Sequence, residues 1–204
     1  MKIVSKKAAI LIVSTILMAA SAACGGFKSV VKQEYSKDDL AFSHFSDWKI
    51  AEDKTTAEAV GSVRFISIEG PDDSILMISR FPGEAEVTLE SYVELLRTGM
   101  KEEAKSMTGG VEVFKMDDGN LNPVEAQIGG VARRGLAREF DIKVLNIPVP
   151  HRSETFLIEN ENEKWFVVAQ SSKEDWEKLR VGFQTIYNSL SFASTPQSGG
   201  GKAK

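Results

Sequence analysis

The feature that most restricts the fold is a pair of apolar segments joined by a short run of turn-forming residues. Residues 62–68 read SVRFISI and residues 74–81 read SILMISRF, while residues 69–73 between them contain Gly, Pro and two Asp. Two β-prone runs on either side of such chemistry are typical of a β-hairpin with a longer loop. The middle of the chain is therefore expected to be built on antiparallel strands.

Further strands are expected from short apolar runs bounded by turn residues, at residues 40–42, 48–50, 111–116, 136–144, 155–158 and 164–170. Residues 136–144 alternate between apolar and charged side chains, as a strand with one buried face and one wet face requires. Arg138 is the exception, because it stands on the face that is otherwise apolar.

Two helices are expected from apolar side chains that recur every three or four residues. The first opens with Thr88 as its N-cap and ends before Gly109-Gly110; its apolar positions are Leu89, Tyr92, Val93, Leu96, Met100 and Met107. The second opens at Ser171 or Ser172, with Ser171 and Glu174 as a capping box; its apolar positions are Trp176, Leu179, Phe183, Ile186, Tyr187 and Leu190. Strands outnumber helices, so we predict an α+β fold, an antiparallel β-sheet with helices packed on it.

The amino end has the features of a secretory signal. Three lysines precede an apolar stretch at residues 8–23, which is shorter than the roughly 20 residues that cross a bilayer. The small residues before Cys24 resemble the lipobox of bacterial lipoproteins, in which this cysteine takes up diacylglyceryl and acyl chains such as palmitate. The resemblance implies a signal peptide over residues 1–23, lipidation of Cys24 and a lipid anchor in the cell envelope, at the outer membrane or the periplasmic face of the inner membrane.

Two other interpretations of this segment stay open. Ordinary signal-peptidase cleavage after Ala23 would leave a free N-terminal thiol, and an uncleaved anchor would leave the whole segment in place. For the rest of the chain we expect a flexible tether at residues 24–37, one domain at residues 38–192 and a disordered, small-residue tail at residues 193–204.

Composition and motifs argue against several classes of function. A formal net charge of −4 gives no sign of nucleic-acid binding, and two histidines are too few for a multi-histidine metal cage. No G-x-S-x-G or H-E-x-x-H motif is present. We expect His44 to be partly buried and hydrogen-bonded and His151 to be solvated, so neither catalysis nor a cofactor is predicted.

The order of the segments resembles that of the PsbP-like family, which includes DcrB-type bacterial lipoproteins. The resemblance begins at the Ser46-Asp47-Trp48-Lys49-Ile50 motif and continues with a helix opened by TLESYV at residues 88–93. A strand pair around residues 128–132 follows. The closing segments are residues 164–170, 176–179 and 186–192. The resemblance covers residues 38–192. It implies an α/β/α sandwich and a non-catalytic domain that docks on a partner.

We therefore expect a non-enzymatic accessory or docking subunit of a cell-envelope complex, monomeric outside that complex, with a protein as its partner. The candidate partner loop is apolar and stiffened by proline, and consists of Asn146, Ile147, Pro148, Val149, Pro150 and His151. The end of an edge strand explains the same residues equally well.

Two alternatives remain. A small-ligand carrier would have an apolar pocket between sheet and helix, lined by residues such as Phe65, Met77 and Trp165, whereas a docking module would have a filled core and an apolar surface patch. A hydrolase would need polar side chains that converge in a cleft, and the sequence offers no such set.

Overall fold

The computed structural model describes residues 30–107, 114–116, 119–144, 147–160 and 162–192. The predicted signal peptide, Cys24 and the C-terminal tail lie outside these ranges, and so does Asn146 of the predicted partner loop.

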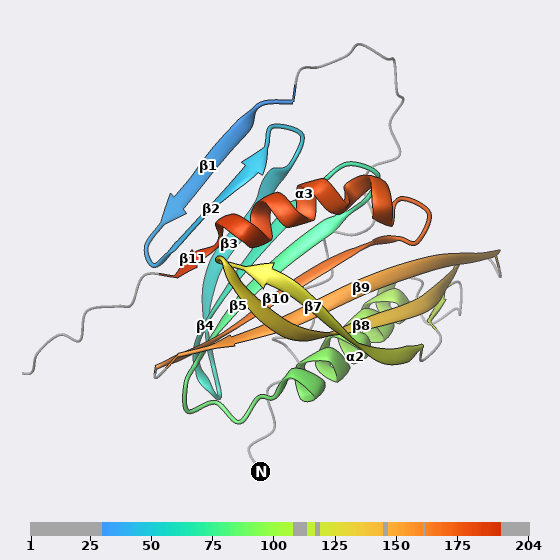
Figure 1. The fold of residues 1–204 in the computed structure, drawn as a ribbon. Helices are drawn as coiled ribbons and strands as arrows, with labels where there is room; N and C mark the ends of the chain where they lie inside the picture. Colours follow the sequence, from blue (N-terminus) through green and yellow to red (C-terminus); the bar gives the residue numbers. More distant parts are fainter. Residues whose placement is uncertain (1–29, 108–113, 117–118, 145–146, 161, 193–204) are drawn as a thin grey trace, which may run out of the picture.

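An antiparallel sheet forms the centre of the described domain (Figure 1). Its strand order is β3-β4-β5-β10-β9-β8-β6, and β7 also pairs with β8. The bounds are β3 Lys49–Glu58, β4 Gly61–Glu69, β5 Ile75–Pro82, β6 Phe114–Met116, β7 Asn120–Ile128, β8 Val131–Val144, β9 Ile147–Glu159 and β10 Glu163–Ser172. The hairpin predicted from the two apolar runs is confirmed as β4–β5, with Ile66 opposite Ile78.

A smaller sheet of β1 (Lys32–Lys37), β2 (Leu40–Phe45) and β11 (Ser191–Phe192) lies beside it. The prediction of a tether up to residue 37 is therefore wrong from Lys32 on. Asp38 adopts a positive φ of 52°, which turns the chain so that β1 pairs with β2. The ring of Tyr35 stacks on Phe42 at 4.7 Å between centroids, and this contact holds the strand in place.

The two helices cover opposite faces of the large sheet, which confirms the predicted α+β fold and its layers (Figure 1). α3 (Trp176–Ser189) packs through Phe183 and Ile186 on one apolar cluster of the sheet. α2 (Leu89–Met107) packs through Tyr92 and Leu96 on the other. Side chains alternate along each strand, so a single sheet supplies both clusters.

The predicted N-cap of α2 is confirmed, because the backbone N–H of Ser91 donates to Thr88 Oγ1 at 3.2 Å. The predicted start of the second helix is wrong, since α3 begins at Trp176. Pairing with β9 extends β10 as far as Ser172, and the Ser172 hydroxyl accepts the backbone N–H of Asp175 at 3.1 Å in the turn that follows. Ser171 and Glu174 therefore form no capping box.

Candidate functional site

The predicted partner loop is part of a long hairpin. Residues 147–151 open β9 and pair with the end of β8, with Ile147 opposite Val144 and Val149 opposite Ile142. The interpretation as a loop is therefore wrong, and the pairing supports the alternative, the end of a strand that lacks one neighbour strand. The prolines are compatible with a strand here because the β10–β9 ladder ends at His151. On that side Pro150 only accepts, through its carbonyl oxygen, the backbone N–H of Lys173 at 2.8 Å, and this bond needs no N–H from the proline.

The end of this hairpin carries exposed apolar side chains. Ile147 is 66% exposed and Val149 is 36% exposed. Alternation along the two strands places both on the same face of the sheet as Ile142 and Phe140. We name Ile147 and Val149 the hairpin surface.

The two histidines differ in their surroundings. His44 is buried and its Nδ1 lies 2.9 Å from the carbonyl oxygen of Phe45, which confirms a buried, hydrogen-bonded histidine. His151 is half-buried, and its ring stacks on that of Phe140 with the ring centroids 5.8 Å apart. The prediction that His151 is solvated is therefore wrong. Burial lowers the pKa of His151, although a hydrogen bond with the carbonyl of Val149 opposes the shift.

The prediction of a single apolar cavity lined by Phe65, Met77 and Trp165, as a carrier would have, is also wrong. Phe65 and Met77 lie in the cluster under α2, whereas Trp165 lies in the cluster under α3. The sheet itself separates them, so the three side chains cannot line one cavity.

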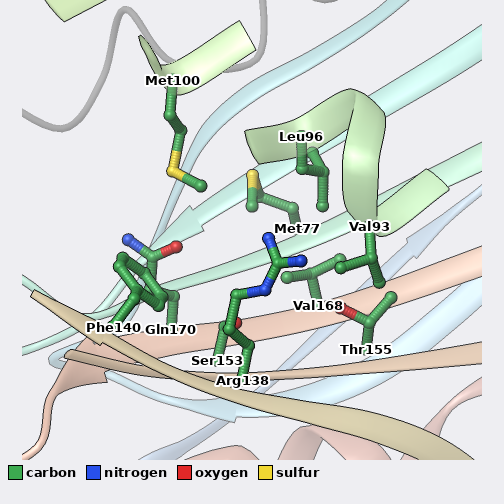
Figure 2. A pocket seen from close by; sticks show the side chains of 10 residues that line it. All are labelled: Met77, Val93, Leu96, Met100, Arg138, Phe140, Ser153, Thr155, Val168 and Gln170. Atoms are coloured by element: carbon green, nitrogen blue, oxygen red, sulfur yellow. The ribbon is translucent and has the colours of Figure 1, made fainter. Parts of the chain in front are cut away.

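A small pocket does lie between α2 and the sheet, and we name it the α2 pocket (Figure 2). It holds about 20 Å³, enough for a single water molecule. Its walls are largely apolar and its lining residues are Met77, Val93, Leu96, Met100, Arg138, Phe140, Ser153, Thr155, Val168 and Gln170.

Among the described residues, Arg138 is the one charged residue that lines the α2 pocket. It is 6% exposed, and its Nη2 donates to Oε1 of Glu94 on α2. Oε2 of Glu94 accepts from Arg97 Nε at 2.7 Å. Burial would raise the pKa of Glu94, but the hydrogen bonds from Arg138 and Arg97 hold it below its usual value. Nε of Arg138 is buried and has no partner among the described residues.

A second, polar groove of about 350 Å³ lies between α3 and β7. On its floor Arg152 donates to Glu154 at 2.7 Å and lies over the ring of Trp176 at 5.1 Å. Tyr187 lines the groove, and its buried hydroxyl has no partner in the described part of the chain. The charged residues that line the groove all form ion pairs with described residues: Glu125, Arg152, Glu154, Glu177 and Arg180.

The described residues form neither a metal cluster nor a membrane-spanning helix. No three His, Cys, Asp or Glu side chains of the described residues gather closely enough to hold a metal ion. None of the helices described here is long and apolar enough to cross a membrane.

Comparison with known proteins shows likeness only at the level of solved structures. No family model and no curated protein matches the chain. The solution structure of cyanobacterial PsbP (CyanoP) from Synechocystis sp. PCC 6803 is similar at a TM-score of 0.46 and 15% identity, over 84% of this chain and 98% of that one.

Two crystal structures show weaker likeness. LpqN of Mycobacterium tuberculosis, described as involved in cell envelope biogenesis, has a TM-score of 0.37 and 8% identity, over 82% of this chain and 93% of that one. A protein from Bacteroides thetaiotaomicron VPI-5482 has a TM-score of 0.38 and 13% identity, over 76% of this chain and 45% of that one. The fold class rests on the strands and helices described above.

Proposed function

We propose that this chain is a non-enzymatic, lipid-anchored docking domain of the bacterial cell envelope, and that it recognises a protein partner through the hairpin surface. The observation that carries the proposal is the exposure of Ile147 and Val149 side by side at the end of the β8–β9 hairpin. Apolar side chains exposed together at a projecting end bury area readily against a partner.

The packing of the core supports docking over carriage of a large ligand. Both apolar clusters are filled by large side chains such as Trp165, Phe166 and Phe183. The α2 pocket, at about 20 Å³, falls far below the roughly 300–1,000 Å³ of ordinary ligand pockets. The groove between α3 and β7 reaches that range at about 350 Å³, but its lining is polar. The end of the hairpin thus offers an open apolar contact area, whereas the α2 pocket would have to widen before it admitted a ligand.

The experiment is cross-linking mass spectrometry on membranes of the bacterium that makes the protein. The intact chain is compared with a variant carrying Ile147→Ser and Val149→Ser. The matched control is Val181→Ser, because Val181 is 62% exposed on α3. We expect one reproducible partner whose cross-links are lost in the double variant and kept in the control. Equal cross-links from all three proteins, or none that reproduces, would overturn the proposed docking role.

The anchor is tested separately. Cys24→Ala should move the protein from the membrane fraction to the soluble envelope fraction, because acyl chains on that cysteine are proposed to supply the membrane affinity. A variant that stays in the membrane would contradict lipidation and would leave the test of the hairpin surface unaffected.

A further inference from the structure

We infer that the α2 pocket is a binding site for an anionic amphiphile, a molecule with one carboxylate or phosphate head and an unbranched apolar tail, and that Arg138 binds its head. This inference goes beyond the proposed docking role and does not depend on it. It rests on the surroundings of one buried cation.

Arg138 is a charged residue at a buried, largely apolar position. It breaks the apolar face of residues 136–144, and the structure turns its side chain into the α2 pocket, where Figure 2 shows it directed toward Met77. Arg138 has five N–H donors and a permanent charge, and burying them is costly unless they are satisfied. Yet its Nε is buried without a partner among the described residues.

The carboxylate that compensates Arg138 is shared. Glu94 offers one oxygen to Arg138 and the other to Arg97, and its side chain is 46% exposed. One partly solvated carboxylate divided between two guanidinium groups leaves Arg138 able to accept a second anion. A carboxylate or phosphate head has the acceptor geometry that a guanidinium binds through two parallel hydrogen bonds.

The walls of the pocket suit an apolar tail. Met77, Leu96, Met100 and Phe140 line the pocket together with Arg138. The space of about 20 Å³ must widen for a ligand, and methionine side chains, which are unbranched and flexible, adapt to a new neighbour at low cost. Beyond Phe140 the same face of the hairpin continues to Ile142, which extends the apolar path for a tail.

The probes are decanoate, decyl phosphate and decanol, which share a tail and differ in the head. Their affinities are measured by titration calorimetry on the full chain carrying Cys24→Ala, so that no acyl chain of the protein competes. We expect at least one anionic probe to bind about tenfold or more tightly than decanol, since a hydrogen bond to a charged group is worth that much. The better of the two anions identifies the head as carboxylate or phosphate.

Three variants locate the anion. Arg138→Gln should remove the preference for the anionic probes, and Arg134→Gln should keep it, because Arg134 lies on the same strand but is exposed. Glu94→Gln should tighten anion binding several-fold, since it removes the carboxylate that competes for Arg138. A urea unfolding curve for each variant shows whether it folds.

The inference is overturned if decanol binds as tightly as both anions, or if Arg134→Gln and Arg138→Gln have equal effects. Glu94→Gln provides the decisive test if Arg138→Gln does not fold. Unchanged or weaker anion binding in that variant would mean that the Arg138–Glu94 pair only fastens α2 to the sheet.

Discussion

The indole ring of Trp48 lies against the backbone of Gly182 in α3, so closely that a Cβ atom at position 182 would come within 2.5 Å of the ring. The same ring contacts Phe183 edge-on, with centroids 5.1 Å apart. On another side it approaches Gly70, where an added Cβ would lie 2.9 Å away. Trp48 therefore joins the segment before β3, the β4–β5 turn and α3, which explains structurally why a tryptophan follows Ser46-Asp47.

Gly182→Ala should destabilise the protein even though alanine favours a helix. The gain in helix propensity is at most about 1 kcal/mol. Against it stands the clash of the new methyl group with a buried ring, and overpacking of this kind costs about 1–3 kcal/mol. Urea unfolding measures the difference. Val181→Ala is the control in the next residue, which is exposed, and it should stay within about 0.5 kcal/mol of the parent. A more stable Gly182→Ala would contradict the contact.

Asp53→Asn should cost about 3–5 kcal/mol, because it leaves a buried cation without its main partner. Arg64 is 2% exposed, and it donates to both oxygens of Asp53, at 2.9 and 3.1 Å, and to Asp39 at 2.9 Å. The cluster ties the turn between β1 and β2 to the large sheet. Glu125→Gln is the control, since Glu125 pairs with Arg134 in solvent and should cost about 1 kcal/mol or less. Equal losses for the two variants would refute a structural role for the cluster.

The same cluster makes the stability depend on acid. Burial opposes the shift, but hydrogen bonds from Arg64, Lys37 and Tyr35 hold the pKa of Asp53 well below its usual range. A depressed folded pKa stabilises the protein above the unfolded value of about 4, and this stabilisation is lost as the pH falls through the folded pKa. The urea concentration at the midpoint of unfolding should therefore fall as the pH is lowered below about 4, and it should fall less steeply in Asp53→Asn. If the urea midpoints of the parent and of Asp53→Asn fell in parallel with pH, the result would contradict the lowered pKa of Asp53.

The sequence predicted the parts of the fold that follow from local periodicity and turn chemistry. The β4–β5 hairpin and the N-cap Thr88 belong to this class. Strand β1 was missed because its residues are polar and its pairing depends on the turn at Asp38.

The site was predictable only in part. Arg138 stood out in the sequence as a charge on an apolar face, but its partner Glu94 lies 44 residues earlier on a different element. For residues 147–151 the sequence left a loop and the end of an edge strand equally open, because two prolines in five residues fit either one. The pairing of β9 with β8, and the absence of β10 beside Pro148, decide between them. Both failures concern contacts that only the tertiary fold creates.

The three tyrosines of the chain should resist ionisation at the pH where free tyrosine titrates. Burial, followed by the hydrogen bond to Asp53, raises the pKa of Tyr35 to about 12. Burial also raises the pKa of Tyr92 to about 12 and places that of Tyr187 well above its usual value. Because each folded pKa is raised, the stabilisation is complete below the unfolded value of about 10 and is lost as the pH rises through the folded value.

Ultraviolet absorbance during an alkaline titration measures this directly. In concentrated urea all three phenols should ionise together near pH 10, whereas the folded protein should show almost no phenolate there and should ionise only as it unfolds. Asp53→Asn should lower the pKa of Tyr35 alone, since it removes the charge that Tyr35 faces at 2.6 Å and leaves Tyr92 and Tyr187 unchanged. A third of the absorbance change appearing near pH 10 in the parent would mean that one of the three rings is exposed to solvent, and loss of that fraction in a Tyr35→Phe variant would identify the β1–β2 hairpin as the part that opens.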